Sequence, residues 1–386
     1  MSAGLRIAVI GSRGIPAGYG GFETFAQELA PRLVTRGHTV AVYGRRGYTG
    51  DPHPNEYHGV RVIHTPALRR RSLEQLSHEL TSILHSLGRR FQLYYFLGYR
   101  GAPFYLPLRA LRAPVIVNTD GLEWRRRKWN IAGRTYLKFA EWLVAKAAAD
   151  ELISDARAIA GLYQERYRRA STYIPSGAYV YEHHEMVDGV LERHGLHPGS
   201  YYLAVCRIEP ENNVDLLVKE FIASGSPLQL VIVGGMNYQT PYWGQLQRLA
   251  AGGEVRFLGP TYGPMLVETL QLGAYAYLHG HEVGGTNPAL LQAMGCGNLA
   301  IALMTPFNIE NAADGGVYWT KTPGSLAERI RWADAHPRLV AQYGQKARER
   351  IRDNFTWDAV ADAHDSLFRE TARRHGIPVE VPRTSG

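Results

Sequence analysis

The sequence predicts an α/β protein with two parallel-sheet domains. Strand-like apolar runs alternate with helix-like stretches along most of the chain, a pattern typical of parallel sheets covered by helices on both faces. A polar, histidine-rich break at about 176–198 separates two similar halves. At 386 residues the chain is long enough for two domains. We expect two such sheets in tandem to face each other across a central cleft.

Composition narrows the class of protein. Hydrophobic residues make up 45% and charged residues 20%, as in a soluble globular protein. The two cysteines, Cys206 and Cys296, imply no disulfide framework, so we expect a reducing cytoplasm. We also expect no signal peptide and no membrane-spanning helix. The net charge of +8 favours an acidic partner: nucleic acid, an anionic membrane surface or a phosphorylated substrate.

The first half opens with a strand at 5–10, a glycine-rich loop at 11–21 and a helix at about 22–36. The glycines of the loop miss the dinucleotide-binding spacing, and no Gly-Lys-Ser/Thr closes it as in a P-loop. The loop therefore either admits a substrate or makes a long turn. The strands and helices that follow are expected at 39–43, 60–64, 72–87, 92–97, 115–118, 134–149, 151–154, 156–167 and 172–174.

Polar residues follow the strand at 115–118. Asp120 and Glu123 stand at its carboxyl end, where ligands of parallel sheets bind. Four consecutive cations at 125–128 then lie between Trp124 and Trp129. Such a run is most often a solvated face. Tryptophan beside lysine and arginine also favours a membrane interface, stacking on a sugar or RNA, and the residues leave these open.

The break at 176–198 reads as the interdomain linker. Its four histidines, His183, His184, His194 and His197, match no metal-ligand spacing, so they are interpreted as solvated. The second half is expected to hold strands and helices at 201–205, 214–223, 229–233, 242–251, 255–258, 264–272, 274–278 and 299–303. The tail is expected to hold helices at 323–335, 337–353 and 356–374, and its composition after Pro378 is typical of disorder.

One loop in the second half is suited to an anion. The strand at 274–278 is followed by the loop 279–287 and a helix that begins near Pro288. Gly284 and Gly285 allow a ligand close to the backbone, and a helix N-terminus attracts negative charge. Thr286 and Asn287 can cap the helix, and Pro288 suits its first turn. The loop therefore predicts a phosphate site, while helix capping alone is the plainer interpretation.

Several motifs together resemble one family. The fold order and Arg207 resemble the GT-B fold of family-4 glycosyltransferases, which has two Rossmann-like domains. Closer similarity to its rhamnosyltransferase subgroup, over about 6–368, is carried by Gly11-Ser12-Arg13-Gly14-Ile15-Pro16, Gly20-Gly21-Phe22-Glu23-Thr24, Asp120-Gly121-Leu122-Glu123-Trp124, Arg207-Ile208-Glu209-Pro210-Glu211-Asn212-Asn213 and Gly284-Gly285-Thr286-Asn287-Pro288.

The resemblance implies an activity and an organisation. Such enzymes transfer a sugar from a nucleoside diphosphate with retention, without a metal or other cofactor. The expected domains are 1–180 for the acceptor and 181–355 for the nucleotide sugar. A helix at 356–377 would pack back on the first domain, and a tail would occupy 378–386.

The resemblance also implies roles for individual residues. Cations and a helix N-terminus would neutralise the leaving diphosphate in place of a metal. The catalytic candidates are Asp120, Arg207 and Glu282. Donor-binding candidates are Gly234, Gly235, Gly284, Gly285, Thr286, Asn287 and Gln292. Acceptor-side candidates are Arg13, Gly20, Gly21, Glu23, Glu123 and Trp124.

The chain departs from the family at two positions. The wider family has glutamates where this chain has Gly284 and Gln292. The first replacement is normal for the subgroup, but the second usually keeps a glutamate that binds the donor ribose. Gln292 retains an acceptor oxygen and loses the stronger, charge-assisted bond. Glu282 is the candidate for partial compensation.

The resemblance therefore implies a bacterial cell-envelope enzyme that transfers L-rhamnose from dTDP-β-L-rhamnose. The acceptor would be a lipid-linked glycan or a polysaccharide, and the protein would be cytoplasmic with peripheral association at the inner face of the plasma membrane. A UDP-hexose donor is the alternative within this class. A non-catalytic nucleotide-sugar-binding protein and a nucleic-acid-binding protein are alternatives outside it, and no nucleic-acid partner is expected.

Overall fold

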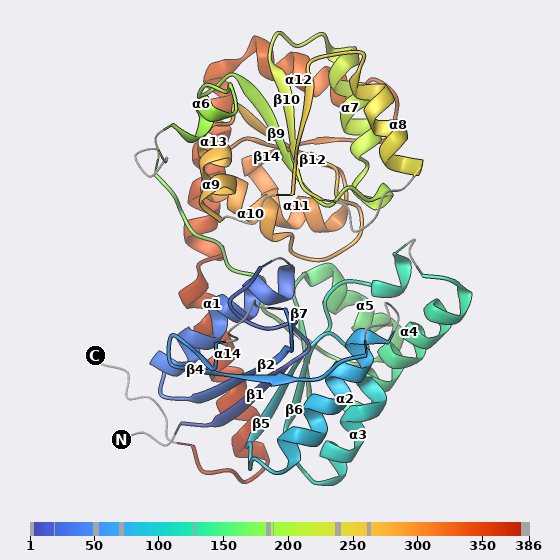
Figure 1. Ribbon diagram of the computed structural model, residues 1–386, viewed down its shortest axis with the longest axis vertical. Helices are drawn as coiled ribbons and strands as arrows, with labels where there is room; N and C mark the ends of the chain where they lie inside the picture. Colours follow the sequence, from blue (N-terminus) through green and yellow to red (C-terminus); the bar gives the residue numbers. More distant parts are fainter. Residues whose placement is uncertain are drawn as a thin grey trace. The chain divides into compact units, whose positions relative to one another are not determined.

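The computed structural model describes residues 4–18, 20–48, 54–68, 73–126, 129–182, 187, 189–235, 241–260 and 264–379. It divides into two compact units (Figure 1), the first formed by Met1–Ser176 with Trp357–Gly386 and the second by Gly177–Thr356. Two cations of the run at 125–128, Arg127 and Lys128, lie outside the described residues. So do His183, His184 and the end of the tail after residue 379.

The first unit contains an eight-stranded sheet in the order β3-β4-β2-β1-β5-β6-β7-β8. All neighbouring strands are parallel except the short pair β3–β4. The strands are β1 (Arg6–Ile10), β2 (Thr39–Arg45), β3 (Glu56–Tyr57), β4 (Val60–Thr65), β5 (Leu93–Leu97), β6 (Val115–Asn118), β7 (Glu151–Ser154) and β8 (Thr172–Tyr173). The central strands are apolar and buried because helices cover both faces.

Two groups of helices cover this sheet (Figure 1). Helices α2, α3 and α4 lie on one side and α1 and α14 on the other. Their bounds are α1 (Gly21–Thr35), α2 (Glu74–Leu87), α3 (Ala102–Ala110), α4 (Ile131–Leu143), α5 (Arg157–Tyr167) and α14 (Trp357–Arg374). A 3-10 turn, η1 (Glu123–Arg125), precedes α4, and a π-helical stretch, Val144–Ala148, follows it.

The helix α14 completes the core of the first unit although it comes last in the chain. Trp357 and Phe368 share one apolar cluster with Leu5 and other residues of the first sheet. The carboxylate of Asp365 lies 2.5 Å from Nε2 of His38. This burial holds the final helix against α1.

The second unit contains a six-stranded parallel sheet in the order β11-β10-β9-β12-β13-β14. The strands are β9 (Tyr201–Val205), β10 (Gln229–Val233), β11 (Val255–Gly259), β12 (Ala276–His279), β13 (Ala300–Leu303) and β14 (Gly316–Trp319). The helices are α6 (Val190–Arg193), α7 (Val214–Ser224), α8 (Pro241–Ala250), α9 (Pro264–Gly273), α10 (Pro288–Gly295), α11 (Pro306–Ala312), α12 (Ser325–Ala335) and α13 (Pro337–Asn354). Two apolar clusters, one on each face, bury the sheet.

The predicted alternation of strands and helices is confirmed, with short elements missed. Helix α3 contains Pro103 and Pro107, which resemble a loop in the sequence. Strand β14 has only 4 residues and helix α11 only 7, too short for a clear periodic pattern. Within the described residues, no helix combines the length and the apolar character needed to cross a bilayer.

Candidate functional site

Each sheet has one point where successive crossover connections leave in opposite directions. In the second sheet this point lies between β9 and β12, which are neighbours although two other strands separate them in sequence. In the first sheet it lies between β1 and β5. Open parallel sheets bind ligands beyond the carboxyl ends of their strands at this position. The loops after these strands are therefore the places to examine.

In the second unit, three loops at this edge pack on one another. Gly234, after β10, has φ of +148°, and a Cβ atom there would collide with the Cys206 carbonyl after β9. The Ile208 N–H donates to the Gly235 carbonyl at 3.1 Å. The Asn213 side chain donates to the Gly280 carbonyl, after β12, at 2.8 Å. The structure thus gathers the loops that carry Arg207, Gly234 and Gly235 beside the loop 280–287.

The start of α10 confirms Asn287 as its cap. Its Oδ1 accepts hydrogen bonds from the backbone N–H groups of Ala289 and Leu290 at 3.0 and 3.2 Å. These two donors of the first helical turn are therefore already used. The N–H groups of Gly284 and Gly285 have no acceptor among the described residues. The available donors lie in the loop before the helix, where φ of Gly284 is +153°.

Asparagine side chains donate hydrogen bonds to carbonyl groups of these loops. Asn212 Nδ2 donates to the Arg207 carbonyl at 2.7 Å, and Asn308 Nδ2 to the His281 carbonyl at 3.0 Å. Asn311 Nδ2 lies 3.5 Å from the Gly285 carbonyl. The carbonyls of Gly280, His281 and Gly285 are bonded, while the N–H groups of Gly284 and Gly285 remain available as hydrogen-bond donors. Such a surface favours an anion.

Two cations stand at this edge, each beside an acid. Arg207 Nη1 lies 3.6 Å from Glu209 Oε1, and both side chains are partly exposed. Lys321 Nζ lies 2.6 Å from Glu282 Oε2. Glu282 thus serves as the partner of a lysine, and its backbone N–H bonds the Glu211 carbonyl at 3.2 Å. Sequence reasoning missed Lys321 because it follows β14, the short strand that was not predicted.

His279 ends β12 directly below the loop, and it too was not among the predicted site residues. Burial lowers its pKa to about 3, so the imidazole is neutral at physiological pH, although a hydrogen bond with Asn308 opposes this shift. Its Nε2 has no partner among the described residues. Its ring stacks between those of Tyr277 and His281. The end of β12 therefore places a neutral imidazole directly before the loop 280–287, whose glycine N–H groups are available as hydrogen-bond donors.

Gln292 lies within α10, on its second turn. Its side chain hydrogen-bonds Tyr181, whose hydroxyl donates to Glu268 Oε1 at 2.9 Å. Burial and the neighbouring Glu268 raise the pKa of Tyr181. Gln292 therefore has a protein partner, Tyr181, which the sequence did not predict.

In the first unit, Glu23 of α1 holds the glycine-rich loop together. It is buried, and its Oε1 accepts the Arg13 N–H at 2.8 Å. A Cβ atom on Gly20 would collide with its other carboxylate oxygen, and Gly21 is the first residue of α1. The Arg13 guanidinium lies 5.9 Å from the centre of the Tyr48 ring. The four predicted acceptor-side residues of this region thus lie together beyond the carboxyl end of β1, and the Glu23 side chain points inward.

Asp120 stands at the carboxyl end of β6. It adopts a left-handed conformation with φ of +51°, and its N–H donates to Asn118 Oδ1 at 3.0 Å. Burial raises the pKa of its carboxyl group, Arg126 opposes this shift, and Glu123 adds to it. The nearest atoms of Arg126 and Asp120 are 4.0 Å apart. Asp120 is thus a partly exposed acid with one distant cationic partner.

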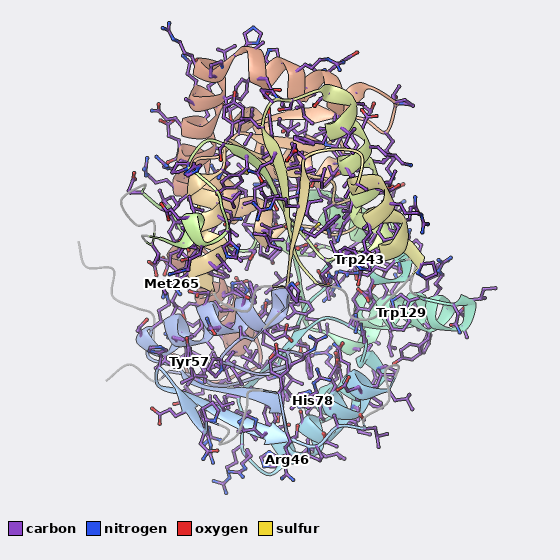
Figure 2. The ribbon with its side chains drawn as sticks, turned by 45° about the horizontal axis from the view of Figure 1, so that its top comes forward. Arg46, Tyr57, His78, Trp129, Trp243 and Met265 are labelled. Atoms are coloured by element: carbon purple, nitrogen blue, oxygen red, sulfur yellow. The ribbon has the colours of Figure 1, made fainter. Side chains whose placement is uncertain are left out.

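Glu123 and Trp124 are engaged in the fold itself. Glu123 is buried between Arg100 and Arg126, at 2.5 and 2.7 Å, and accepts the Trp129 indole N–H at 3.1 Å. Trp124 donates its indole N–H to the buried Glu141 at 2.8 Å. Figure 2 shows Trp129 beside the first turn of α4. Both tryptophans predicted to face a membrane or sugar are therefore anchored inward through their indole nitrogens.

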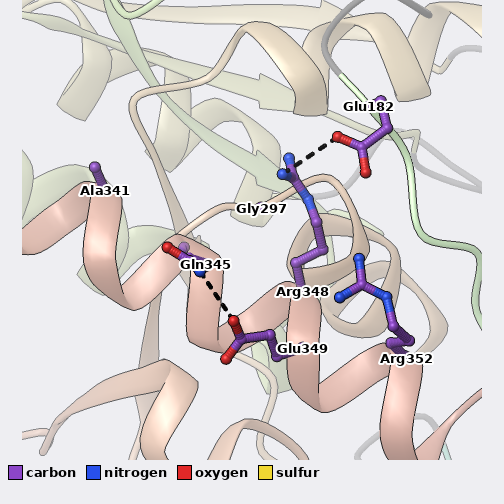
Figure 3. Close-up of a pocket in the computed structure, with 8 residues that line it drawn as sticks. Glu182, Gly297, Ala341, Gln345, Arg348, Glu349 and Arg352 are labelled. Atoms are coloured by element: carbon purple, nitrogen blue, oxygen red, sulfur yellow. Dashed lines mark hydrogen bonds and ion pairs between the residues drawn. The ribbon is translucent and has the colours of Figure 1, made fainter.

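A pocket of the second unit lies apart from these loops (Figure 3). Glu182, Gly297 and residues of α13 line it, including Arg348, Glu349 and Arg352. Arg348 pairs with Glu182 at 3.6 Å and donates to the Cys296 carbonyl. Gly297 follows the C-terminal end of α10, while the donor-rich loop precedes its N-terminus. Within the described residues, no three His, Cys, Asp or Glu side chains gather as a metal site.

Comparison with known proteins finds family models over both halves of the chain. Residues 194–350 match the family model described as glycosyl transferases group 1. Residues 5–179 match a model described only as a domain of unknown function, DUF1972. No curated protein sequence matches significantly.

Solved structures match nearly the whole chain. A sucrose-phosphate synthase from Thermosynechococcus elongatus is 19% identical with a TM-score of 0.79, over 96% of this chain and 100% of that one. HepE from Anabaena, in complex with UDP, is 16% identical with a TM-score of 0.70, over 94% and 99%. A glycosyltransferase from Rickettsia africae is 13% identical with a TM-score of 0.70, over 95% and 98%.

These matches show a GT-B fold for the chain and a similarity of residues 194–350 to group 1 glycosyl transferases. The predicted fold class, two parallel-sheet α/β domains of GT-B type, is confirmed. Membership of family 4 and of the rhamnosyltransferase subgroup stays a prediction.

Proposed function

We propose that the protein is a retaining, metal-independent glycosyltransferase that transfers L-rhamnose from dTDP-β-L-rhamnose. The acceptor would be a lipid-linked glycan or a polysaccharide, used at the inner face of the plasma membrane in cell-envelope synthesis. One observation supports it most strongly: the loop 280–287 presents the N–H groups of Gly284 and Gly285 beside a switch point.

The second unit would bind the donor. Glycine N–H groups and Arg207 would hold the diphosphate and neutralise the charge that grows as the glycosidic bond breaks. Lys321 would add a second cation, with Glu282 orienting it at 2.6 Å. A metal is not required in this scheme because the protein supplies the positive charge.

The first unit would serve the acceptor. Asp120 projects from the β6 edge, and burial raises its pKa. Such a carboxyl group can hydrogen-bond a sugar hydroxyl in either protonation state. Glu23 and Glu123, in contrast, would support the loops from within rather than contact the substrate. Glu23 accepts the Arg13 N–H, and Glu123 pairs with Arg126 of its own loop and with Arg100 after β5.

The rhamnosyl assignment rests on the sequence motifs, above all Gly284-Gly285-Thr286-Asn287-Pro288 and Asp120-Gly121-Leu122-Glu123-Trp124. A UDP-hexose is the second candidate donor. It is favoured by similar structures that were solved with UDP or with UDP-glucose.

The test is thermal melting of the purified protein with dTDP, UDP, GDP and their sugar conjugates. A ligand that binds only the folded state raises Tm by mass action. We expect dTDP and dTDP-rhamnose to raise Tm, and dTDP to be released from dTDP-rhamnose with acceptor-loaded membranes. Shifts with UDP-sugars alone would reassign the donor, and no shift with any nucleotide would contradict the transferase assignment.

A further inference from the structure

Exposed apolar side chains concentrate on one layer of the first unit. Fifteen large hydrophobic side chains are exposed in the described residues, and nine of them come from 73–142. This segment contains α2, α3 and α4, which lie together on one side of the sheet (Figure 1) and pack side by side. We call the exposed side chains of 73–146 the α2–α4 face.

The leucines of α2 form a stripe that packing does not explain. Leu73, Leu80, Leu84 and Leu87 are all exposed, at the spacing of one helical face, and Leu84 is 60% exposed. The opposite face of α2 buries His78, Glu79 and Ile83 instead. A surface helix normally reverses this arrangement, with its apolar stripe inward. The stripe therefore lies outside the core of the unit.

Helix α4 continues the apolar surface with larger side chains. Ile131 is 84% exposed, Phe139 48% and Trp142 46%. The rings of Phe139 and Trp142 stack with centroids 6.0 Å apart. A concentration of exposed apolar side chains on one group of packed helices is typical of an interaction site.

The exposed charge of the α2–α4 face is mainly positive. Seven Arg or Lys side chains are exposed in the described part of 73–146: Arg89, Arg90, Arg112, Arg125, Arg134, Lys138 and Lys146. Of the described acids of that segment, Glu79, Glu123 and Glu141 are buried. Asp120 is partly exposed, and Glu74, whose side chain is 43% exposed, pairs with Arg45. Basic residues around leucine, phenylalanine and tryptophan match the chemistry of an anionic lipid surface, with apolar groups entering the headgroup region.

We infer that the α2–α4 face binds the surface of an anionic lipid bilayer. A second copy of the chain is a poorer occupant because a two-fold interface would oppose the same cations to one another. A nucleic acid would engage the cations but would leave the leucine stripe and Ile131 in water. The surface shares Arg125 with the predicted stretch 124–129, but Trp124 and Trp129 of that stretch point inward and are not part of it. Its binding requires no sugar donor or acceptor.

The experiment is flotation of the full chain with vesicles of phosphatidylcholine alone and with 30% phosphatidylglycerol, without nucleotide. We expect at least tenfold stronger partitioning onto the anionic vesicles at low salt, reduced by 0.5 M NaCl. Phe139→Ser with Trp142→Ser should reduce it about tenfold or more. Arg90→Gln with Arg134→Gln should do the same on anionic vesicles, at about 1 kcal/mol per basic residue.

Met265→Ser is the matched control because Met265 lies in the second unit and is 63% exposed, close to the 60% of Leu84. It should bind vesicles like the wild type, and circular dichroism melts should show that every variant folds. Leu84→Ser gives a second variant on a different helix, expected to weaken binding as well. Equal binding to both vesicle types, undiminished binding of the variants, or a dimer that the Phe139→Ser variant abolishes would overturn the inference. These outcomes are independent of nucleotide melting, which tests the transferase proposal.

Discussion

The loops at the carboxyl ends of the two sheets are hydrogen-bonded in opposite ways. In the first unit, carboxylates accept hydrogen bonds from loop donors, as Glu23 does from the Arg13 N–H and Glu123 from Trp129. In the second unit, asparagine amides donate to loop carbonyls, as Asn212 and Asn308 do. In the first unit, N–H groups of these loops are thus already bonded to protein carboxylates. In the second unit, loop carbonyls are already bonded to protein amides.

The difference bears on where the proposed diphosphate would bind. A loop with bonded carbonyls and available N–H groups attracts an anion, whereas a loop lined by carboxylates repels it. The same architecture therefore gives two chemically distinct edges. The predictions below test this contrast, from the largest expected effect to the smallest.

Arg207→Ala should have the largest effect because it removes a cation from the donor-rich edge. A hydrogen bond to a charged group contributes about 1.5–3 kcal/mol, so nucleoside diphosphate Kd should rise about 10- to 100-fold. Transfer should fall at least as much. Calorimetric titration and a transfer assay measure both. Arg338→Ala, an exposed arginine of α13, is the control and should change neither. An unchanged Kd in Arg207→Ala would show that Arg207 does not contact the nucleotide.

Glu79→Gln tests the carboxylate-rich unit through its pH dependence. Burial raises the pKa of Glu79 to about 7, against its hydrogen bonds from Tyr105 and Gln75. Between pH 4.5 and 7 the unfolded chain therefore binds fewer protons than the folded one, and stability falls as pH rises. The loss amounts to about 3 kcal/mol and ends above the folded pKa.

Glu79→Gln should remove that pH dependence, because the amide cannot ionise and its oxygen can still accept from Tyr105. Urea unfolding at pH 5 and pH 8 measures the change in the free energy of unfolding. Asp358→Asn, on the exposed face of α14, is the control and should keep the wild-type profile. An identical pH profile in Glu79→Gln would show that Glu79 is ionised throughout.

Asn308→Ala tests the amide-rich edge. Asn308 donates to the His281 and Leu303 carbonyls at 3.0 and 2.8 Å, and its loss would leave buried acceptors unpaired. We expect about 1–3 kcal/mol of destabilisation and weaker nucleotide binding, because the loop 280–287 loses its support. Urea unfolding and calorimetry measure these effects. Asn354→Ala, whose amide bonds an exposed carbonyl, should change both little. Equal effects of the two variants would show that the Asn308 amide does not support the loop 280–287.

Gln292→Glu should have the smallest effect on affinity. A carboxylate at this position would strengthen a bond to the donor ribose, as the family resemblance implies, but Glu268 lies next to the same Tyr181 and would repel it. We expect nucleotide Kd to change by less than about tenfold. Calorimetry measures the change, with Tyr181→Phe separating the tyrosine contact. Activity that arises only in Gln292→Glu would favour a non-catalytic binding protein.

Much of the fold follows from sequence periodicity. Strands such as β6 and β10 were predicted at their observed bounds because both are short apolar runs between turn residues. Helix α3 was missed because its prolines resemble loop residues. Local pattern is a good guide where burial dictates residue type, and a poor one where an element is short.

The site was harder to predict because its chemistry depends on contacts between distant segments. The Asn287 cap could be identified locally, whereas the phosphate site in the loop before it stays a prediction. Asn308 reaches the loop from α11, and Lys321 reaches it from the segment after β14; neither segment carries a motif. The inward orientation of Glu123 and Trp129 likewise depends on Arg100 and Arg126.

Hydrogen exchange of the full chain with and without dTDP or UDP tests the central contrast most directly. The account predicts new protection of backbone amides in 280–291 and 206–213 of the second unit, where Gly284 and Gly285 gain an acceptor. It predicts no comparable change in the carboxylate-held loop 11–24. Protection confined to 11–24, with the loop 280–287 unaffected by saturating nucleotide, would contradict it.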